Sequence, residues 1–164
     1  MAIISKKKFN KIEFYKFKAQ GTIFSKQILD RFIEKGFLVG YLGNAVYINT
    51  HLVATYKKEK GKRVKILNKQ FEQLLGFVKE KIKEGKEIIL GGDFNFNSNS
   101  RNYKEITKIL VDNTLKPILK IKSEYKYGQR DFIFSSKKES ENYEEPLYPF
   151  YVSDHPGVSV ELIS

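Results

Sequence analysis

The chain has 164 residues, of which 41% are hydrophobic and 14% aromatic, and this composition excludes an intrinsically disordered protein. No apolar run approaches the roughly 20 residues that span a bilayer. The start is not typical of a signal peptide, because three lysines follow a very short apolar stretch. The chain contains no cysteine, which excludes disulfides and thiolate metal sites. These features fit a reducing compartment, and we expect a cytoplasmic protein.

The basic residues outnumber the acidic ones, 30 against 19, and the formal net charge is +11. A basic surface attracts phosphate-rich partners, either nucleic acid or an anionic membrane. The alternative is a compositional bias, since lysine is common throughout the chain. The length predicts one domain, residues 1–164.

The first third of the chain contains one clear supersecondary signal. Residues 37–42 and 45–49 favour β-structure, and Gly43-Asn44 between them is typical of a two-residue hairpin. Residues 3–5 are short and apolar and are expected to form a strand, whereas residues 6–21 show no pattern that places them.

A long amphipathic helix is predicted next. Its apolar face consists of residues at helical spacing, namely Leu67, Phe71, Leu74, Leu75, Val78 and Ile82. Gly85 is a plausible C-terminal stop, and residues 87–90 form a short buried strand that leads into Gly91.

A second helix is predicted to begin near Asn102, with Glu105 as its capping partner and with Ile106, Ile109 and Leu110 facing inward. Residues 132–134 and 158–162 are the last predicted strands. This order of elements predicts an α/β fold with helices packed against a sheet. The polar motifs fall just after the strands, where a scaffold usually presents reactive groups.

The chain contains two histidines, His51 and His155, and both stand in short polar motifs. A lone histidine is more often a satisfied surface or core residue, but His155 follows Asp154, and an imidazole can take a proton from water. A base of this kind needs an acceptor behind it, and Asp131 suits that role. The alternative is that Asp131 caps or turns the chain.

The segment Gly91-Gly92-Asp93-Phe94-Asn95 is the second polar motif. Two glycines allow a tight turn and a close approach of the backbone to a ligand. Asp93 and Asn95 would point the same way in an extended segment, and together they could bind a metal-bridged phosphate and orient water. The alternative is an ordinary turn.

The order of the motifs resembles the endonuclease/exonuclease/phosphatase superfamily. Asn49-Thr50-His51-Leu52 follows a strand, and after a helix Gly91 to Asn95 follows the next strand. Asp131-Phe132-Ile133-Phe134 and Ser153-Asp154-His155 come later. The resemblance implies a four-layer α/β sandwich in which two β-sheets lie between helices.

The resemblance also implies roles for these residues. His155 would be the general base, Asp131 would orient it, and His51 would stabilise the transition state. Asp93 and Asn95 would hold the nucleophile and the scissile phosphate. Asp93 and Asp154 would be the metal ligands, and the implied ion is Mg²⁺ or Mn²⁺.

The start of the chain departs from the family pattern. Residues 1–36 contain no counterpart of the family's first Asn and metal-binding Glu, and Ile3-Ile4-Ser5-Lys6 resembles a mid-domain strand. We therefore expect an incomplete domain that lacks its N-terminal portion. Its expected partners are a complementing N-terminal segment or a second copy, and the chain alone should bind Mg²⁺ weakly.

Residues 34–38 and 50–56 resemble the neutral-sphingomyelinase-like branch. This favours a metal-dependent phosphodiesterase that acts on a phospholipid head group, at a membrane surface. The net charge favours the first alternative, a DNA or RNA nuclease with the same chemistry. The second alternative is an inactive remnant that binds phosphate or membranes.

Overall fold

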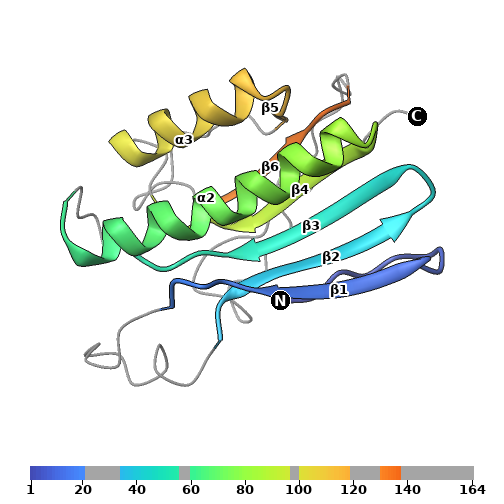
Figure 1. The fold of residues 1–164 in the computed structure, drawn as a ribbon, viewed down its shortest axis with the longest axis horizontal. Coiled ribbons are helices and arrows are strands. Elements are labelled where there is room, and N and C mark those ends of the chain that lie inside the picture. The colour runs from blue at the N-terminus through green and yellow to red at the C-terminus, as the bar shows by residue number, and fades with distance from the viewer. Residues whose placement is uncertain (21–33, 56–59, 97–99, 119–129, 138–164) are drawn as a thin grey trace, which may run out of the picture.

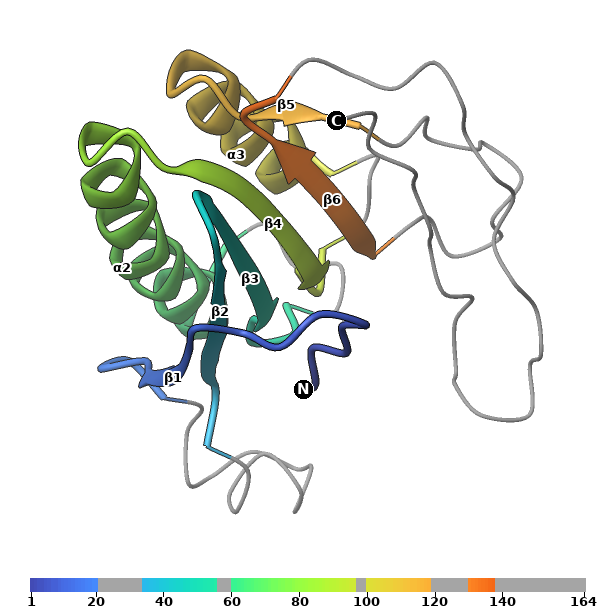
Figure 2. The ribbon, with the colours of Figure 1, turned by 90° about the vertical axis from the view of Figure 1, so that its right-hand side faces the viewer.

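The computed structural model describes residues 1–20, 34–55, 60–96, 100–118 and 130–137. They form a six-stranded sheet with the strand order β1-β2-β3-β4-β6-β5. Two helices, α2 and α3, lie on the same face of this sheet (Figure 1, Figure 2). The predicted α/β class is therefore confirmed. In the described part of the chain, no helix combines the length and the apolar character needed to cross a membrane.

The strands alternate in direction except at the centre of the sheet. Their bounds are β1 (Lys11–Lys16), β2 (Gly36–Leu42), β3 (Ala45–His51), β4 (Glu87–Asp93), β5 (Lys116–Pro117) and β6 (Asp131–Ser135). β3 and β4 are parallel, and the other neighbours are antiparallel. The C-terminal ends of β3 and β4 and the start of β6 therefore meet at one edge of the sheet.

The hairpin between β2 and β3 forms as predicted. Leu42 pairs with Ala45, so two residues make the turn, and Gly43 adopts a positive φ of 58°. A backbone of this kind suits a glycine in a tight turn. The strand that delivers His51 is therefore set by a local sequence signal.

The predicted long helix is α2 (Lys62–Lys83), and its apolar face is the one that the spacing indicated. Leu67, Phe71, Leu74 and Val78 are buried against the sheet, and Leu75 and Ile82 pack at the border of the core. The helix ends before Gly85, which has a φ of 74° and donates its backbone N–H to the Ile82 carbonyl. This confirms the predicted stop.

The second helix, α3 (Arg101–Asp112), corrects two predictions. It begins at Arg101, in agreement with the predicted start near Asn102, but its cap is Ser100, whose hydroxyl accepts a hydrogen bond from the Tyr103 backbone N–H. Glu105 does not take part in this cap; its carboxylate bonds to Arg101 at 2.6 Å. Ile109 is 38% exposed, because the sheet covers only the stripe that contains the buried Ile106 and Leu110.

The N-terminal region also differs from the prediction. Residues 3–5 form no strand, and Ile4 is 95% exposed. The first strand is β1, which lies inside residues 6–21 and pairs with β2 along its whole length. The prediction missed β1 because its sequence carries little periodic signal: the apolar Ile12 and Phe14 are exposed, while Glu13 and Tyr15 between and beside them are half-buried. The two-residue β5 was not predicted either.

The described residues make two layers, a sheet and the helices on it (Figure 2). The other side of the sheet is named the open face here. The N-terminal segment crosses this face, where the Phe9 ring packs edge-on against Tyr47 and the Asn49 side chain donates to the Ala2 carbonyl. The predicted four-layer sandwich requires two sheets, whereas the part of the chain that the structure describes forms a single sheet, so this prediction is not confirmed. The predicted strand 158–162 lies outside the described residues.

Candidate active site at the strand ends

Three of the predicted site residues lie in one row across three strands. His51 is the last residue of β3, Asp93 is the last residue of β4, and Asp131 is the first of β6. The register pairs His51 with Asp93 and Asp93 with Asp131. Directly paired residues project to the same face of a sheet, so one imidazole and two carboxylates come together on the open face.

Glycine brings β3 and β4 into this register. Gly92 has a φ of 132°, a conformation that side chains with a Cβ rarely adopt. A Cβ at this position would lie 2.0 Å from the Thr50 carbonyl oxygen, whereas a Cβ at Gly91 would meet nothing closer than 3.5 Å. The two glycines therefore differ: Gly92 is required by the close approach of β4 to β3, and Gly91 is not.

Hydrogen bonds then tie together the loops that follow the strands. The Leu52 backbone N–H donates to the Asp93 carbonyl at 3.0 Å, and the Phe94 N–H donates to the Arg130 carbonyl at 3.1 Å. Segment 93–95 is thereby held between the end of β3 and the start of β6. The polar side chains at this edge stand on a fixed backbone rather than on a free loop.

Asn95 does not continue the strand, which corrects the expectation that Asp93 and Asn95 point the same way in an extended segment. Its φ is 55°, a left-handed conformation that Asn tolerates. The Asp93 carboxylate accepts from the Asn95 backbone N–H at 2.7 Å, and the Asn95 side-chain amide donates to the Leu52 carbonyl at 2.8 Å. Asn95 therefore joins the loop after β4 to the loop after β3.

The His51 imidazole is 44% exposed, and its Nε2 lies 3.8 Å from a carboxylate oxygen of Asp93, which is 18% exposed. Partial burial, reinforced by the positive charge of Lys35, lowers the pKa of His51 below its ordinary value of about 6.5. The carboxylates of Asp93 and Asp131 act in the opposite direction but do not overcome it. His51 is therefore mainly neutral at pH 7, a state in which it can donate one N–H.

Lys35 is a site residue that the sequence analysis did not identify. Its side chain is only 6% exposed, and its ammonium lies 3.4 Å from the Leu52 carbonyl, which also accepts from Asn95. Buried lysines are rare unless they are paired, so this placement is a specific feature of the edge. The sequence carried one signal, a lysine directly before a strand, but no pattern in the chain predicts which carbonyl it reaches.

Two predicted site residues, Asp154 and His155, lie outside the described residues. The structure thus brings His51, Asp93, Asn95 and Asp131 together and leaves the position of the predicted base untested. Asp93 is the one predicted metal ligand that the described residues include. Within the described ranges, no group of three or more His, Cys, Asp or Glu side chains is arranged to hold a metal ion.

Among known proteins, similarity to this chain is found at the level of the fold. No family model matches this sequence, and no curated protein sequence does. Several solved structures, however, are similar to the structure of this chain. The chain shares its fold with sphingomyelinase C from Streptomyces griseocarneus, with a TM-score of 0.55 and 17% identity over 85% of this chain and 56% of that one. SmcL gives a TM-score of 0.59 and 18% identity, over 86% of this chain and 55% of that one.

The chain therefore spans little more than half the length of the structures it resembles. At these identities the likeness establishes the fold and leaves the activity open. The shared fold is the mixed α/β arrangement described above, and it agrees with the predicted α/β class; the four-layer sandwich stays a prediction.

Proposed function

We propose that this chain carries part of the active site of a metal-dependent phosphodiester hydrolase, a sphingomyelinase-like one that releases the head group of a phospholipid. The row of His51, Asp93 and Asp131 across three adjacent strands is the observation that carries this proposal. The fold supports it, because one of the structures that share it is a sphingomyelinase C.

In the proposed reaction, water attacks the phosphorus and its proton passes to His155. The bond from phosphorus to the lipid oxygen breaks and that oxygen takes up a proton from the solvent, so that an alcohol and a phosphomonoester leave. Asp131 orients the His155 imidazole, and Asp93 and Asn95 hold the water and the phosphate. The neutral His51 donates its N–H to a phosphate oxygen as negative charge develops there.

We propose Mg²⁺ or Mn²⁺ as the cofactor, with Asp93 and Asp154 as ligands. A divalent ion would polarise a phosphate oxygen and offset the charge of the transition state. Asp93 offers a partly buried carboxylate at the correct edge of the sheet. The described residues do not complete a metal site by themselves, and a dication needs several oxygen ligands to give up its water.

We further propose that full activity requires more polypeptide than this chain, either a complementing segment or a second copy. Two observations support this. The chain spans 55–56% of the length of the structures that share its fold. On the open face, Ile12 is 60% exposed and Phe14 48% exposed, although apolar side chains of this size usually pack against something.

The test is an assay of the 164-residue chain with Mg²⁺ on sphingomyelin vesicles and on plasmid DNA. Each assay is run with and without an added polypeptide that carries the family's Asn and Glu segment. We expect sphingomyelin hydrolysis only with the added polypeptide. We also expect it to be lost in Asp93→Asn and kept in Asp112→Asn, a control carboxylate at the end of α3.

A nuclease is the second candidate, and the net charge of +11 favours it. Cleavage of plasmid DNA without hydrolysis of sphingomyelin would select this candidate and overturn the lipid proposal. Inactivity on both substrates, with phosphate binding retained, would show that the chain is a binding remnant.

A further inference from the structure

The exposed side of α2 is strongly basic at one end. Lys62, Lys65 and Lys69 follow one another at spacings of three and four residues, so they project from one face of the helix, and all three are exposed. The first acidic residue of the helix is Glu72. Three turns of the helix thus present positive charge without a negative residue among them.

The other end of the same helix carries both signs, because Glu80 and Glu84 stand among its lysines. Lys81 lies 3.2 Å from the Glu80 carboxylate and 2.7 Å from that of Glu84. Lys137 pairs in the same way with Glu87 at 2.9 Å, just beyond the helix. The basic character is therefore concentrated at the N-terminal end and is not a uniform property of α2.

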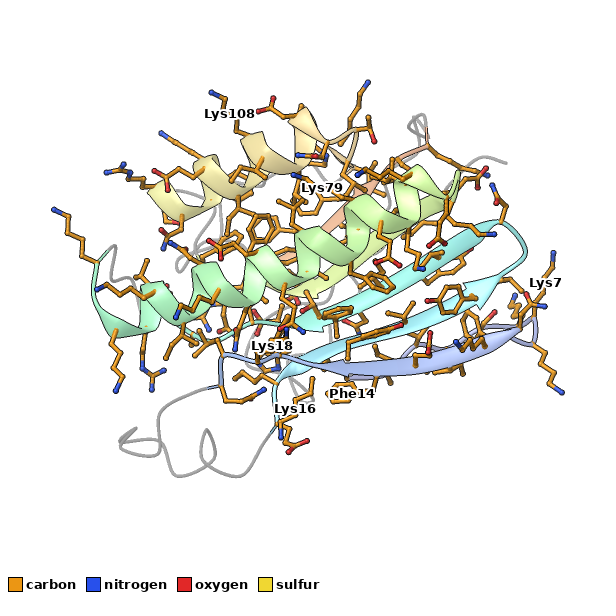
Figure 3. All side chains as sticks on the ribbon, viewed as in Figure 1. Lys7, Phe14, Lys16, Lys18, Lys79 and Lys108 are labelled. Atoms are coloured by element: carbon orange, nitrogen blue, oxygen red, sulfur yellow. The ribbon has the colours of Figure 1, made fainter. Side chains whose placement is uncertain are left out.

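A fourth lysine, from a distant part of the sequence, joins this end. Lys18 and Lys69 line the same open depression, together with Glu72 and Gln73. Gln73 holds the Lys18 segment in place: it accepts from the Lys18 backbone N–H at 2.8 Å and donates to the Lys16 carbonyl at 3.0 Å. Figure 3 shows Lys18 next to α2. Lys18, Lys62, Lys65 and Lys69 are named the basic patch here.

The basic patch lacks the compensation that a structural cluster would have. None of its four ammonium groups forms an ion pair with any residue that the structure describes. The first turn of α2 contains no acidic residue and no side chain caps it, so the lysines there oppose the helix dipole. Each such cation destabilises a helix by a few tenths of a kcal/mol, about 0.3–1 at low salt. These lysines lower the stability of α2, and no ion pair among the described residues offsets this cost. Such a cluster points to a role in binding rather than in folding.

The basic patch lies at the same end of the molecule as the candidate active site. The N-terminal half of α2 contacts the residues that directly follow His51. Gln70 accepts from the Val53 backbone at 2.9 Å, and Arg63 donates to the Ala54 carbonyl at 3.1 Å. In Figure 1 the tip of β3 and the start of α2 lie toward the same side. A surface bound by the basic patch would therefore lie at the end of the sheet where β3 and β4 finish, on the helix-covered side, while His51 and Asp93 project from the open face at that same end.

We infer that the basic patch is a docking surface for an anionic lipid bilayer, placed so that the strand ends lie near the membrane. This inference rests on the proposed function, since a hydrolase that cleaves lipid head groups must be held at a bilayer. Each lysine near an anionic bilayer contributes about 1 kcal/mol of attraction, and it needs no specific partner to do so.

The composition of the patch favours a bilayer over nucleic acid. Its four cations are lysines, which act as point charges and lack the forked geometry with which arginine binds phosphates and bases. The neighbouring Arg63 directs its guanidinium to the Ala54 carbonyl of its own chain. No exposed aromatic side chain lies on α2, so the described part of this surface offers no platform for stacking bases. The basic patch therefore provides non-specific electrostatic attraction to the negatively charged surface of a bilayer.

The experiment measures co-sedimentation of the full chain with vesicles in EDTA, so that binding is recorded without any turnover. Vesicles of phosphatidylcholine with 30% phosphatidylserine are compared with vesicles of phosphatidylcholine alone. We expect binding to the anionic vesicles only, and release at high salt. The triple variant Lys62→Gln/Lys65→Gln/Lys69→Gln should bind the anionic vesicles about 100-fold more weakly. Its matched control, Lys79→Gln/Lys83→Gln/Lys86→Gln, removes the same charge from the other end and should bind within about threefold of the wild type.

Equal losses in the two triple variants would overturn the inference, because net charge alone would then explain binding. It would also be overturned if the first variant lost affinity for duplex DNA but kept its affinity for vesicles. Because binding is measured without metal, the two proposals can fail separately. A chain that docks, but does not hydrolyse sphingomyelin even with Mg²⁺ and the added polypeptide, would refute the proposed function and leave the docking surface standing.

Discussion

The two faces of the sheet are formed by the same strands but differ in burial and in the residues they present. On the helix-covered face, Val46, Ile48 and Leu90 are at most 3% exposed and belong to one continuous core. On the open face, the same strands end in His51 and Asp93, whose side chains remain partly accessible. The alternation of side chains along a strand makes this division possible, because successive residues project to opposite faces.

This comparison teaches where each kind of residue can be changed. We expect substitutions under the helices to change the free energy of unfolding, and substitutions at the strand ends on the open face to change the proposed activity. Gly92 belongs to both classes, since it sets the register that places Asp93 beside His51.

The largest expected effect is on turnover. His51→Gln removes the imidazole from the open face, and we expect the rate of the complemented enzyme to fall by about 10²–10³-fold, as for the loss of one transition-state donor. The free energy of unfolding should change by less than about 0.5 kcal/mol, since the side chain is nearly half exposed. Steady-state kinetics and urea unfolding measure the two quantities, and a large loss of stability would contradict the division between the faces.

The next effect concerns the covered face. Leu74→Ala removes a fully buried side chain of α2 and should lower the free energy of unfolding by about 2–5 kcal/mol. Its control, Ile12→Ala, removes an aliphatic side chain that is 60% exposed on β1, and the change should stay below about 1 kcal/mol. Urea unfolding of both variants checks this. Similar losses would mean that the open face is packed as tightly as the covered one.

A smaller effect distinguishes the two neighbouring glycines. Gly92→Ala places a Cβ against the Thr50 carbonyl at a positive φ and should destabilise the chain by about 2–3 kcal/mol. Gly91→Ala meets only ordinary contacts and should change stability by less than about 1 kcal/mol. Thermal unfolding separates the two variants. If Gly91→Ala were the more damaging one, the register between β3 and β4 would differ from the one described.

The smallest effect is electrostatic. Lys35→Met removes a buried positive charge near His51, so the pKa of His51 should rise while Asp93 and Asp131 continue to favour its charged form. An NMR titration of the imidazole measures this, with Lys79→Met as a control at an exposed lysine. A pKa that stayed the same or fell would show that Lys35 does not act on His51.

The same shift has a consequence for stability. In the wild type the folded pKa of His51 lies below the unfolded one, so the unfolded chain binds more protons as the pH falls. The contribution of His51 to stability is thus complete above about pH 6.5 and is lost as the pH falls below it. Lys35→Met should make this loss smaller.

Local signals in the sequence were sufficient for several elements. The helical spacing of Leu67, Phe71 and Leu74 gave the buried face of α2, and Gly43-Asn44 gave the hairpin turn, because each signal acts over a few residues. The order of the polar motifs also placed His51, Asp93 and Asp131 at strand ends. Parallel strands with a helical crossover bring such ends to one edge.

Other features needed the three-dimensional arrangement. β1 is a strand because its backbone pairs with β2, and its own sequence carries little periodic signal. The left-handed turn at Asn95 and the approach of Lys35 to the Leu52 carbonyl depend on groups 43 and 17 residues away in the chain. No local pattern encodes such contacts.

The sequence by itself therefore predicted the candidate site residues and the elements on which they stand, since secondary structure and turns follow from short-range spacing. The tertiary structure alone decided which neighbours those residues have. The charge state of His51 is the clearest case: the residue is readable in the sequence, but its lowered pKa arises from burial and from Lys35, which only the folded chain brings close.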